Sequence, residues 1–222
     1  LYTSETRFSV GLGIDHAFKN DKEGEDVKDS SLVPVFVYTT KNQTVLRAFL
    51  QNYLMGGRVF SDMALAYNNY PDKFFGIGND TKLEDEESFR EEFSRFKWDI
   101  LPRIFTHTYI GPTLHYERFV YHDKEKNGLL KTTPITGQNR GTLVGTGVRL
   151  LYSSRDNDFH PHKGSQHEYK YTRFDKKTGS DYAYSQHELR LRHYLPLSTQ
   201  NTLAFEALYW GQSGDVPFQH LA

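Results

Sequence analysis

The chain of 222 residues contains no cysteine and no apolar run long enough to form a membrane-spanning helix. The absence of cysteine excludes disulfides and thiolate metal sites, and it is compatible with an oxidising envelope compartment. Because a spanning helix needs about 18 consecutive apolar residues, the sequence excludes a helical membrane protein. A membrane-spanning barrel stays open as a class, since its strands need only about 9–11 residues of alternating character.

The chain also lacks an excess of either charge, with 27 basic residues, 28 acidic residues and a net charge of −1. A nucleic-acid-binding protein would carry a basic patch, so we expect no nucleic-acid partner. Hydrophobic residues make up 37% of the chain and aromatic residues 15%. Because the hydrophobic fraction is below the ~45–50% of soluble domains while rings are abundant, the composition favours β-strands and membrane interfaces.

Apolar and polar residues alternate with period two along much of the chain, which is typical of strands whose two faces meet different surroundings. The segment from Arg7 to Asp15 shows this most clearly. Its apolar face consists of Phe8, Val10, Leu12 and Ile14, and its other face of glycine and polar residues. Such a strand has one apolar face and one face of small or polar residues.

The same division returns late in the chain, between Tyr184 and Leu195. There Glu188, Arg190 and Arg192 alternate with leucines, so the charges lie on one face only. Ten segments in all are predicted to be strands. They run from Arg7 to Asp15, Leu32 to Thr40, Val45 to Leu54, Val59 to Tyr67, Arg90 to Ile104, Tyr109 to Tyr121, Gly141 to Tyr152, His167 to Phe174, Tyr184 to Leu195 and Thr202 to Trp210.

Connections between these strands are either tight turns or longer polar loops, and barrels place short turns on one rim and long loops on the other. Counting strands from a periplasmic start puts the turn after the Gly141 to Tyr152 strand on the wrong rim. We therefore expect a missed or miscut strand between Pro71 and Ile104. The tight turns are Lys41 to Gln43, Gly56 to Gly57 and Ser198 to Asn201, and the longer loops are Lys19 to Ser31, Asn79 to Glu87, His122 to Arg140 and Asp175 to Ser180.

The run from Leu83 to Phe96 is the one segment that also suits a helix. Phe93, Phe96 and Ile100 fit a helical stripe, but Phe96, Trp98 and Ile100 alternate with charged residues as a strand would. We predict a strand there, because no clear period of 3.6 supports a helix.

Periodicity alone does not say which face meets lipid. In a soluble sandwich or lipocalin-like barrel the apolar face looks inward, whereas in a membrane barrel it looks outward. The polar faces here carry glycine together with charges of both signs. Glycine costs strand stability and is hard to justify on an open solvent face, whereas inside a barrel it makes room for neighbours. We therefore expect an antiparallel transmembrane β-barrel in which Glu188, Arg190 and Arg192 face the lumen.

One stretch, from Gly147 to Gly164, resembles the signature of the BamA/TamA-type surface-antigen superfamily of outer-membrane barrels. In that family a strand ends in Tyr-Asp-x-Arg-Asp-Asn, followed by an aromatic residue, Pro-x-x-Gly and the next strand. Ser153 replaces the usual aspartate here. The matching positions are Tyr152, Arg155, Asp156, Asn157, Phe159, Pro161 and Gly164.

This turn also has a coherent physical interpretation without any catalysis. Pro161 fixes its own φ, Gly164 tolerates positive φ, and Arg155, Asp156 and Asn157 can satisfy backbone groups of the turn.

The resemblance extends over most of the chain in its layout. Three expected strands follow the signature before Gly211 to Ala222, where the family begins a long inward-folding loop that usually carries Arg-Gly-Tyr or Arg-Gly-Phe. The sequence ends at Ala222 without that tripeptide. We therefore expect residues 1–222 to be the N-terminal part of one barrel domain, with about 10–11 strands of a sixteen-strand barrel and no POTRA repeat.

The sequence gives only weak support for a metal site, a nucleophilic catalytic site or a cation-binding site. His160 and His162 flank a proline and, with Asp156 and Asp158, suggest a metal site, but their spacing is a poor chelate and a turn is favoured. No Gly-x-Ser-x-Gly elbow occurs, and the acidic run from Asp80 to Glu92 is better explained as a solvated loop. We expect no catalytic site, no metal and no cofactor.

The resemblance implies a protein of the bacterial outer membrane that helps insert or translocate other outer-membrane proteins through an opening strand edge. Its partners would be outer-membrane lipid and client outer-membrane proteins. The strand from Arg7 to Phe18, which carries Phe8, Val10, Leu12 and Ile14, would then be the seam that templates a client strand. Two alternatives stay open, namely a passive pore or surface protein and a soluble lipocalin-like barrel.

Overall fold

The computed structural model describes residues 2–3, 7–19, 28–158 and 160–221. These residues form one antiparallel sheet in which consecutive strands are neighbours, in the order β1-β2-β4-β5-β6-β7-β8-β9-β10-β11-β12, with the short β3 paired to β4. The strands are β1 Tyr2–Thr3, β2 Arg7–Gly13, β3 His16–Phe18, β4 Ser30–Thr39, β5 Thr44–Leu54, β6 Val59–Phe74, β7 Glu87–Phe105, β8 Thr108–His122, β9 Arg140–Ser153, β10 Gly164–Phe174, β11 Tyr184–Pro196 and β12 Thr202–Gly214.

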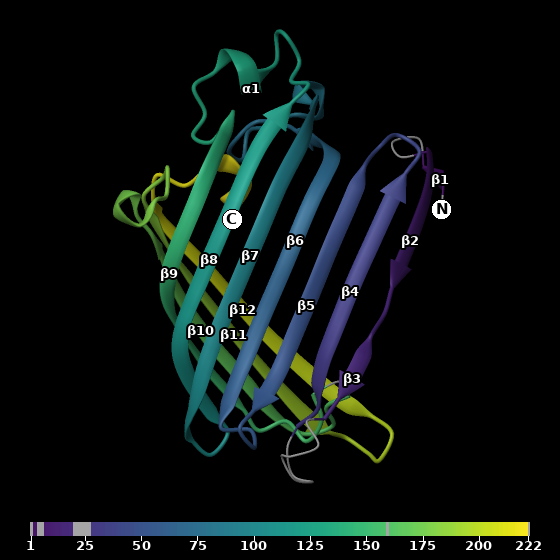
Figure 1. Ribbon diagram of the computed structural model, residues 1–222, viewed down its shortest axis with the longest axis vertical. Helices are drawn as coiled ribbons and strands as arrows, with labels where there is room; N and C mark the ends of the chain where they lie inside the picture. Colours follow the sequence, from purple (N-terminus) through teal and green to yellow (C-terminus); the bar gives the residue numbers. More distant parts are fainter. Residues whose placement is uncertain (1, 4–6, 20–27, 159, 222) are drawn as a thin grey trace.

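The sheet curls into a wall of a barrel. In Figure 1, β4 to β8 form the near side and β10 to β12 pass behind them. Among the described residues β1 and β12 are the outermost strands and do not pair with each other, so the barrel is partial. The prediction of an all-β, antiparallel, partial transmembrane barrel is confirmed, since each of the ten expected segments contains a strand and only short ones are added.

Among the described residues, helical structure is confined to four short segments, three in connections between strands and one after β12. These are the helix α1 Leu129–Thr132 and the 3-10 turns η1 Leu83–Asp85, η2 Lys176–Thr178 and η3 Phe218–His220. The strand prediction for the charged run is confirmed, because β7 begins at Glu87 and only Leu83–Asp85 is helical.

No strand was missed between Pro71 and Ile104, so that part of the expectation is wrong, whereas the strand bounds there were miscut, because β6 continues to Phe74 and β7 begins at Glu87. Over that stretch the described chain holds only the end of β6, a connection over residues 75–86, and β7. The conflict over which rim carries each connection arose because the first strand was assumed to start at the periplasmic rim. β2 runs toward the rim that carries residues 55–58 and 197–201, which puts every later connection on a consistent side (Figure 1).

The expected separation of tight turns from long loops is also imperfect. The tight turn at residues 40–43 lies on the rim of the long connections 75–86, 123–139 and 175–183, and the connection 154–163 lies on the opposite rim. We call these the long-loop rim and the short-turn rim. In an antiparallel sheet, strand alternation decides the rim of each connection, whereas its length is set locally.

Side chains on the convex face are largely apolar. Strand register places Leu65 of β6, Phe96 of β7 and Tyr116 of β8 side by side on this face. In β2 the exposed fractions reach 65% for Phe8 and 76% for Val10. An exposed apolar wall of this extent is what a barrel presents to acyl chains, and it would be a liability in water.

The concave face contains two buried apolar clusters separated by polar residues. Near the short-turn rim the lower cluster consists of Tyr53, Phe60, Leu101, Tyr109 and Leu151. The upper cluster, toward the long-loop rim, consists of Phe74, Phe89, Phe93, Phe119, Tyr121, Leu130, Leu143, Phe174 and Tyr184. This is the reverse of a lipocalin-like barrel, whose charged residues would face out and whose apolar residues would line the interior throughout.

Candidate functional site

A layer of ion pairs crosses the concave face between the two clusters. Arg149 of β9 donates hydrogen bonds to Asp62 over 2.6 Å, to Asp99 over 2.7 Å and to Glu168 over 2.9 Å. The Lys170 ammonium lies 3.0 Å from both oxygens of Asp99. Each charged side chain of this layer therefore has a partner of opposite sign. Thr113 completes it by donating to Asp99.

A second polar group gathers around Glu117 of β8, which is 1% exposed. Its carboxylate accepts from Arg95 over 2.5 Å and lies 3.3 Å from the His115 ring and 3.0 Å from the His220 ring. His220 follows the last strand, so the end of the chain lies inside the wall. Phe218 supports this placement, because its ring contacts Phe74, Phe89 and Tyr121.

The residues predicted to face the lumen lie on the concave side of β11, in register with this polar layer. Glu188 accepts from Gln186 over 2.6 Å. Arg190 and Arg192 both approach Glu206 of β12, at 3.3 and 3.2 Å. The two arginines thus pair with the neighbouring strand β12, whereas Glu188 bonds within β11.

The expected seam strand is split in the structure. β2 ends at Gly13, and β3 begins at His16, so the segment from Arg7 to Phe18 is not one strand. β1 also pairs with the start of β2, at Phe8 and Arg7. Beyond Phe8, from Val10 to Gly13, no described strand pairs with the side of β2 that faces away from β4.

Hydrogen bonds show which residues of β2 direct their backbone groups toward β4 and which direct them toward the open edge. The Phe8 carbonyl accepts from Thr40 over 2.9 Å, and the Ile14 amide donates to Pro34 over 3.1 Å. Even-numbered residues therefore bond to β4, and Gly11 and Gly13 direct their amide and carbonyl groups toward the open edge. This edge is a place where another strand can pair.

The signature turn lies on the short-turn rim. Asp156 accepts hydrogen bonds from the backbone amides of His162 and Lys163 over 3.0 and 3.2 Å. Asn157 accepts from the His160 amide over 2.9 Å. Slight desolvation would raise the pKa of Asp156, but the amides of Lys163 and His162 hold that pKa below its usual value.

The other matched positions are placed as follows. Gly164 has a φ of 102°, and a Cβ there would meet the Ser154 carbonyl, so only glycine fits. Tyr152 lies on the convex face, its ring centre 5.7 Å from that of His167. Pro161 is half-buried in the turn. Phe159 lies outside the described residues.

The sequence prediction missed Asp158, which was weighed only as a weak metal ligand. In the structure it accepts from Arg155 over 2.8 Å, from Lys28 over 2.8 Å and from Tyr53 over 3.1 Å. Period two identifies the face of a strand residue, but it carries no signal for a contact between strands that do not pair. Arg149 and His220 were missed for the same reason, because their partners Asp62 and Glu117 lie on strands with which their own segments do not pair.

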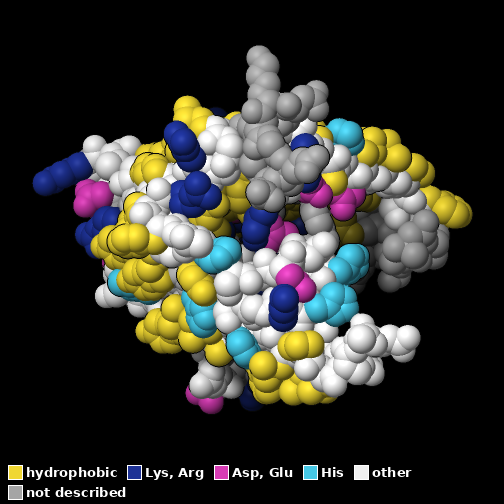
Figure 2. Space-filling view, turned by 90° about the horizontal axis from the view of Figure 1, so that it is seen from below, with side chains coloured by type: hydrophobic (Ala, Val, Ile, Leu, Met, Phe, Trp, Pro, Cys, Tyr) yellow, Lys and Arg dark blue, Asp and Glu magenta, His cyan; other side chains and the backbone are white. Residues whose placement is uncertain are grey.

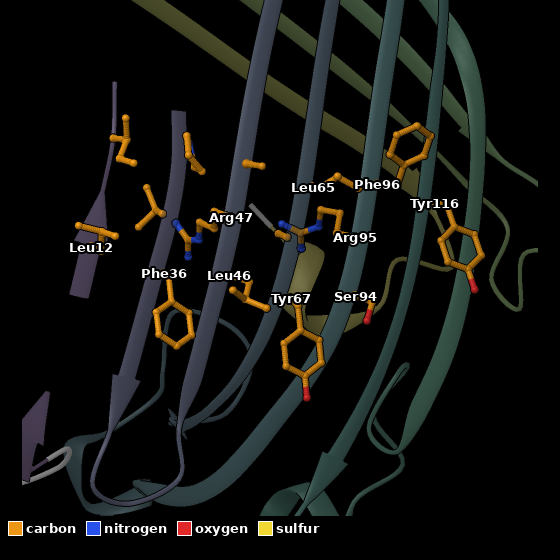
Figure 3. A pocket seen from close by; sticks show the side chains of 15 residues that line it. Leu12, Phe36, Leu46, Arg47, Leu65, Tyr67, Ser94, Arg95, Phe96 and Tyr116 are labelled. Carbon is orange, nitrogen blue, oxygen red and sulfur yellow. The ribbon is translucent and has the colours of Figure 1, made fainter. Parts of the chain in front are cut away.

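A shallow apolar groove of about 660 Å³ runs over the convex side of β2 to β8. Figure 3 shows its lining side chains, most of which belong to the convex face, including Leu12, Phe36, Leu46, Leu65 and Phe96. Its shape and apolar lining suit acyl chains.

Figure 2 looks onto the short-turn rim. Hydrophobic side chains occupy much of the outer surface, and acidic and basic side chains lie near the centre. Among the described residues, no three histidine or carboxylate side chains gather as a metal site would require. No described helix is both long enough and apolar enough to cross a membrane.

Comparison with known proteins finds solved structures of similar fold. No family profile and no curated protein sequence matches the chain. The chain is similar to the crystal structure of BamA from Haemophilus ducreyi lacking POTRA domains 1–3, with a TM-score of 0.60 and 16% sequence identity. The match covers 100% of this chain and 42% of that chain.

At this identity the likeness shows the fold. The chain has a BamA-like outer-membrane barrel fold and spans less than half the length of the BamA chain it matches.

Proposed function

We propose that this chain is the N-terminal part of one barrel domain of a BamA/TamA-type protein, that it resides in the bacterial outer membrane, and that it assists the insertion or translocation of other outer-membrane proteins. The observation that supports this most directly is the inverted wall. Apolar residues such as Val10 are exposed on the convex face, whereas Arg149 and Glu117 are buried on the concave face. Outer-membrane lipid is then the partner of the convex face.

The sheet edge supports the finer part of the proposal. Gly11 and Gly13 present backbone groups toward the open side of β2, and neither carries a side chain that would obstruct an incoming strand. A client strand that adds there would gain main-chain hydrogen bonds. The convex residues Phe8, Val10, Leu12 and Ile14 would continue the lipid-facing surface onto the client. No catalytic residue is needed for this role.

A passive pore is the weaker alternative. An open channel would keep inward residues wetted, yet Leu101, Phe119, Leu143 and Phe174 on the concave face are each 0% exposed. The ion-pair layer and the inward end of the chain add to this packing.

The proposal is tested by photo-crosslinking during assisted folding. The full chain is reconstituted in phosphatidylethanolamine/phosphatidylglycerol vesicles with a photoreactive amino acid in place of Leu12, and a urea-unfolded outer-membrane barrel protein is added as client. Leu114 of β8 is the matched control, because it is also an outward leucine but lies in the middle of the wall. We expect capture of the client at Leu12 only, together with faster client folding than in empty vesicles.

Equal capture at Leu12 and Leu114 would count against an edge-templated function. Client folding at the rate of empty vesicles would count against any insertion role. Ion-selective conductance of the same vesicles, with no client capture, would favour the pore.

A further inference from the structure

At the short-turn rim, the side chain of Asp158 joins three separate parts of the chain, and the function proposed above does not explain this contact. Its carboxylate accepts from Lys28 and Arg155 over 2.8 Å each and from the Tyr53 hydroxyl over 3.1 Å. The Asp158 side chain is 19% exposed and the Arg155 side chain 13%. Charge-assisted hydrogen bonds in such a sheltered place are stronger than those of an open surface pair.

The residues in this contact belong to parts of the sheet that are not neighbours. Asp158 and Arg155 belong to the connection between β9 and β10, whereas Tyr53 lies at the end of β5 and Lys28 lies just before β4. Three strands, β6, β7 and β8, separate β5 from β9 in the sheet. The contact therefore crosses the concave side of the barrel and does not follow the sheet.

Both ends of this contact are firmly anchored. The Tyr53 ring packs in the lower cluster, with ring centres 4.9 Å from Phe60 and 6.5 Å from Tyr109. On the other side Arg155 also donates to the Asp158 carbonyl over 3.2 Å, which holds the turn itself in shape. Movement at one end is therefore transmitted to the other.

The anchor continues to the first strands of the sheet. The Tyr53 amide donates to the Ser30 hydroxyl over 3.0 Å at the start of β4. From there β4 pairs with β3, where Phe18 lies opposite Ser30, and farther along with β2. Asp158 is thus linked, through Lys28 and β4, to the strands that form the open edge.

We propose that Asp158 is a positioning residue that holds the wall of β2 to β5 against the turn between β9 and β10, and so sets how readily the open edge of β2 moves. The consequence for clients rests on the function proposed above, whereas the effect on strand mobility does not. Asparagine in place of Asp158 removes the negative charge and one of the two acceptor oxygens, so Lys28 and Tyr53 lose their charged common acceptor. The first strands then keep their pairing with β5 and the longer bond from Lys28 to the Ser153 hydroxyl, at 3.4 Å.

Hydrogen exchange of the full chain in vesicles measures this mobility directly. In the Asp158→Asn variant we expect amides of β2, β3 and β4 to exchange about tenfold faster, while those of β11 and β12 are unchanged. The matched control is Asp156→Asn, because Asp156 lies in the same turn but accepts from the backbone amides of His162 and Lys163 within that turn, so the substitution leaves the contact across the barrel intact.

Lys28 variants give a milder test, since Asp158 then keeps Arg155 and Tyr53. We expect Lys28→Met to accelerate exchange in the same strands and Lys28→Arg to restore it. In the double variant with Asp158→Asn, the two effects should not add, because both changes break one interaction. A residue that only stabilises the fold would give additive effects and faster exchange in every strand.

Exchange in Asp158→Asn that matches Asp156→Asn, or additive effects in the double variant, would overturn the proposal. Client capture at Leu12 separates the two hypotheses. If wild type captures no client while Asp158→Asn loosens β2, the proposed function fails and the positioning role stands. If wild type captures the client and Asp158→Asn changes neither capture nor exchange, the positioning role fails.

Discussion

Arg149 on β9 donates a hydrogen bond to Asp62 on β6 over 2.6 Å, although β7 and β8 lie between their strands. Such a contact requires the sheet to be strongly curved, with both side chains on its inner face. It therefore identifies the concave side without reference to any membrane. The outward direction of the apolar residues follows from the same register.

Replacing Arg149 with methionine should destabilise the barrel strongly. Asp62, Asp99 and Glu168 would lose a shared donor on the buried face, and breaking a buried pair costs about 3–5 kcal/mol. Urea unfolding of the protein in vesicles, followed by tryptophan fluorescence, measures the change. Arg173→Met is the control, because the Arg173 side chain is 47% exposed. A loss no larger than that of the control would contradict a structural role for the ion-pair layer.

Neighbouring residues of β11 should report opposite environments. Because the chain has no cysteine, Leu191→Cys and Arg190→Cys each create a single labelling site. We expect a fluorophore at position 191 to be quenched by brominated lipid and one at position 190 to be quenched by aqueous iodide. Reversed quenching would mean that the apolar face looks inward and that Glu188, Arg190 and Arg192 do not face the lumen.

Gly147 should not tolerate even one added methyl group. A Cβ at Gly147 would collide with the Tyr171 carbonyl of the paired strand, whereas a Cβ at Gly13 would lie 3.8 Å from Val35. We expect Gly147→Ala to cost about 1–3 kcal/mol by overpacking and Gly13→Ala to be nearly neutral. Equal unfolding midpoints in urea for the two variants would argue against the close approach of β9 and β10.

The signature turn should loosen in acid. The pKa of Asp156 is held below its ordinary value of 3.8 by the amides that donate to it. A lowered pKa means that the ionised form stabilises the turn above the ordinary value and that this stabilisation is lost as the pH falls through the lowered pKa. NMR shifts of the His162 and Lys163 amides should therefore titrate below 3.8, and the titration should vanish in Asp156→Asn. A midpoint at or above 3.8 would contradict this.

Strand positions were largely predictable because each strand separates two environments. The alternation of Glu188, Arg190 and Arg192 with leucines was sufficient to identify β11, and the glycines opposite Phe8 to Ile14 indicated which face is the inner one. Strand ends were less predictable. β6 continues to Phe74 and β7 begins at Glu87, because polar residues near the long-loop rim keep pairing after the apolar alternation has ended.

The contacts of the candidate site were predictable from the sequence only where both partners lie close together in the chain. Asp156 and Asn157 bond to amides within their own turn, and residue type together with spacing is enough to indicate such bonds. Tyr53 and Lys28, the partners of Asp158 from outside its turn, are 105 and 130 residues away in the chain. No local pattern encodes that distance.

By itself, the sequence determined that this protein is built from antiparallel strands with one apolar and one polar face, because residues that alternate must face different surroundings. Only the tertiary structure decided that β2 runs toward the short-turn rim, that β1 lies outside it, and that Asp158 connects the two sides of the mouth. These features depend on how far the sheet curls, and curvature is the sum of small twists between many strands, which no single segment specifies.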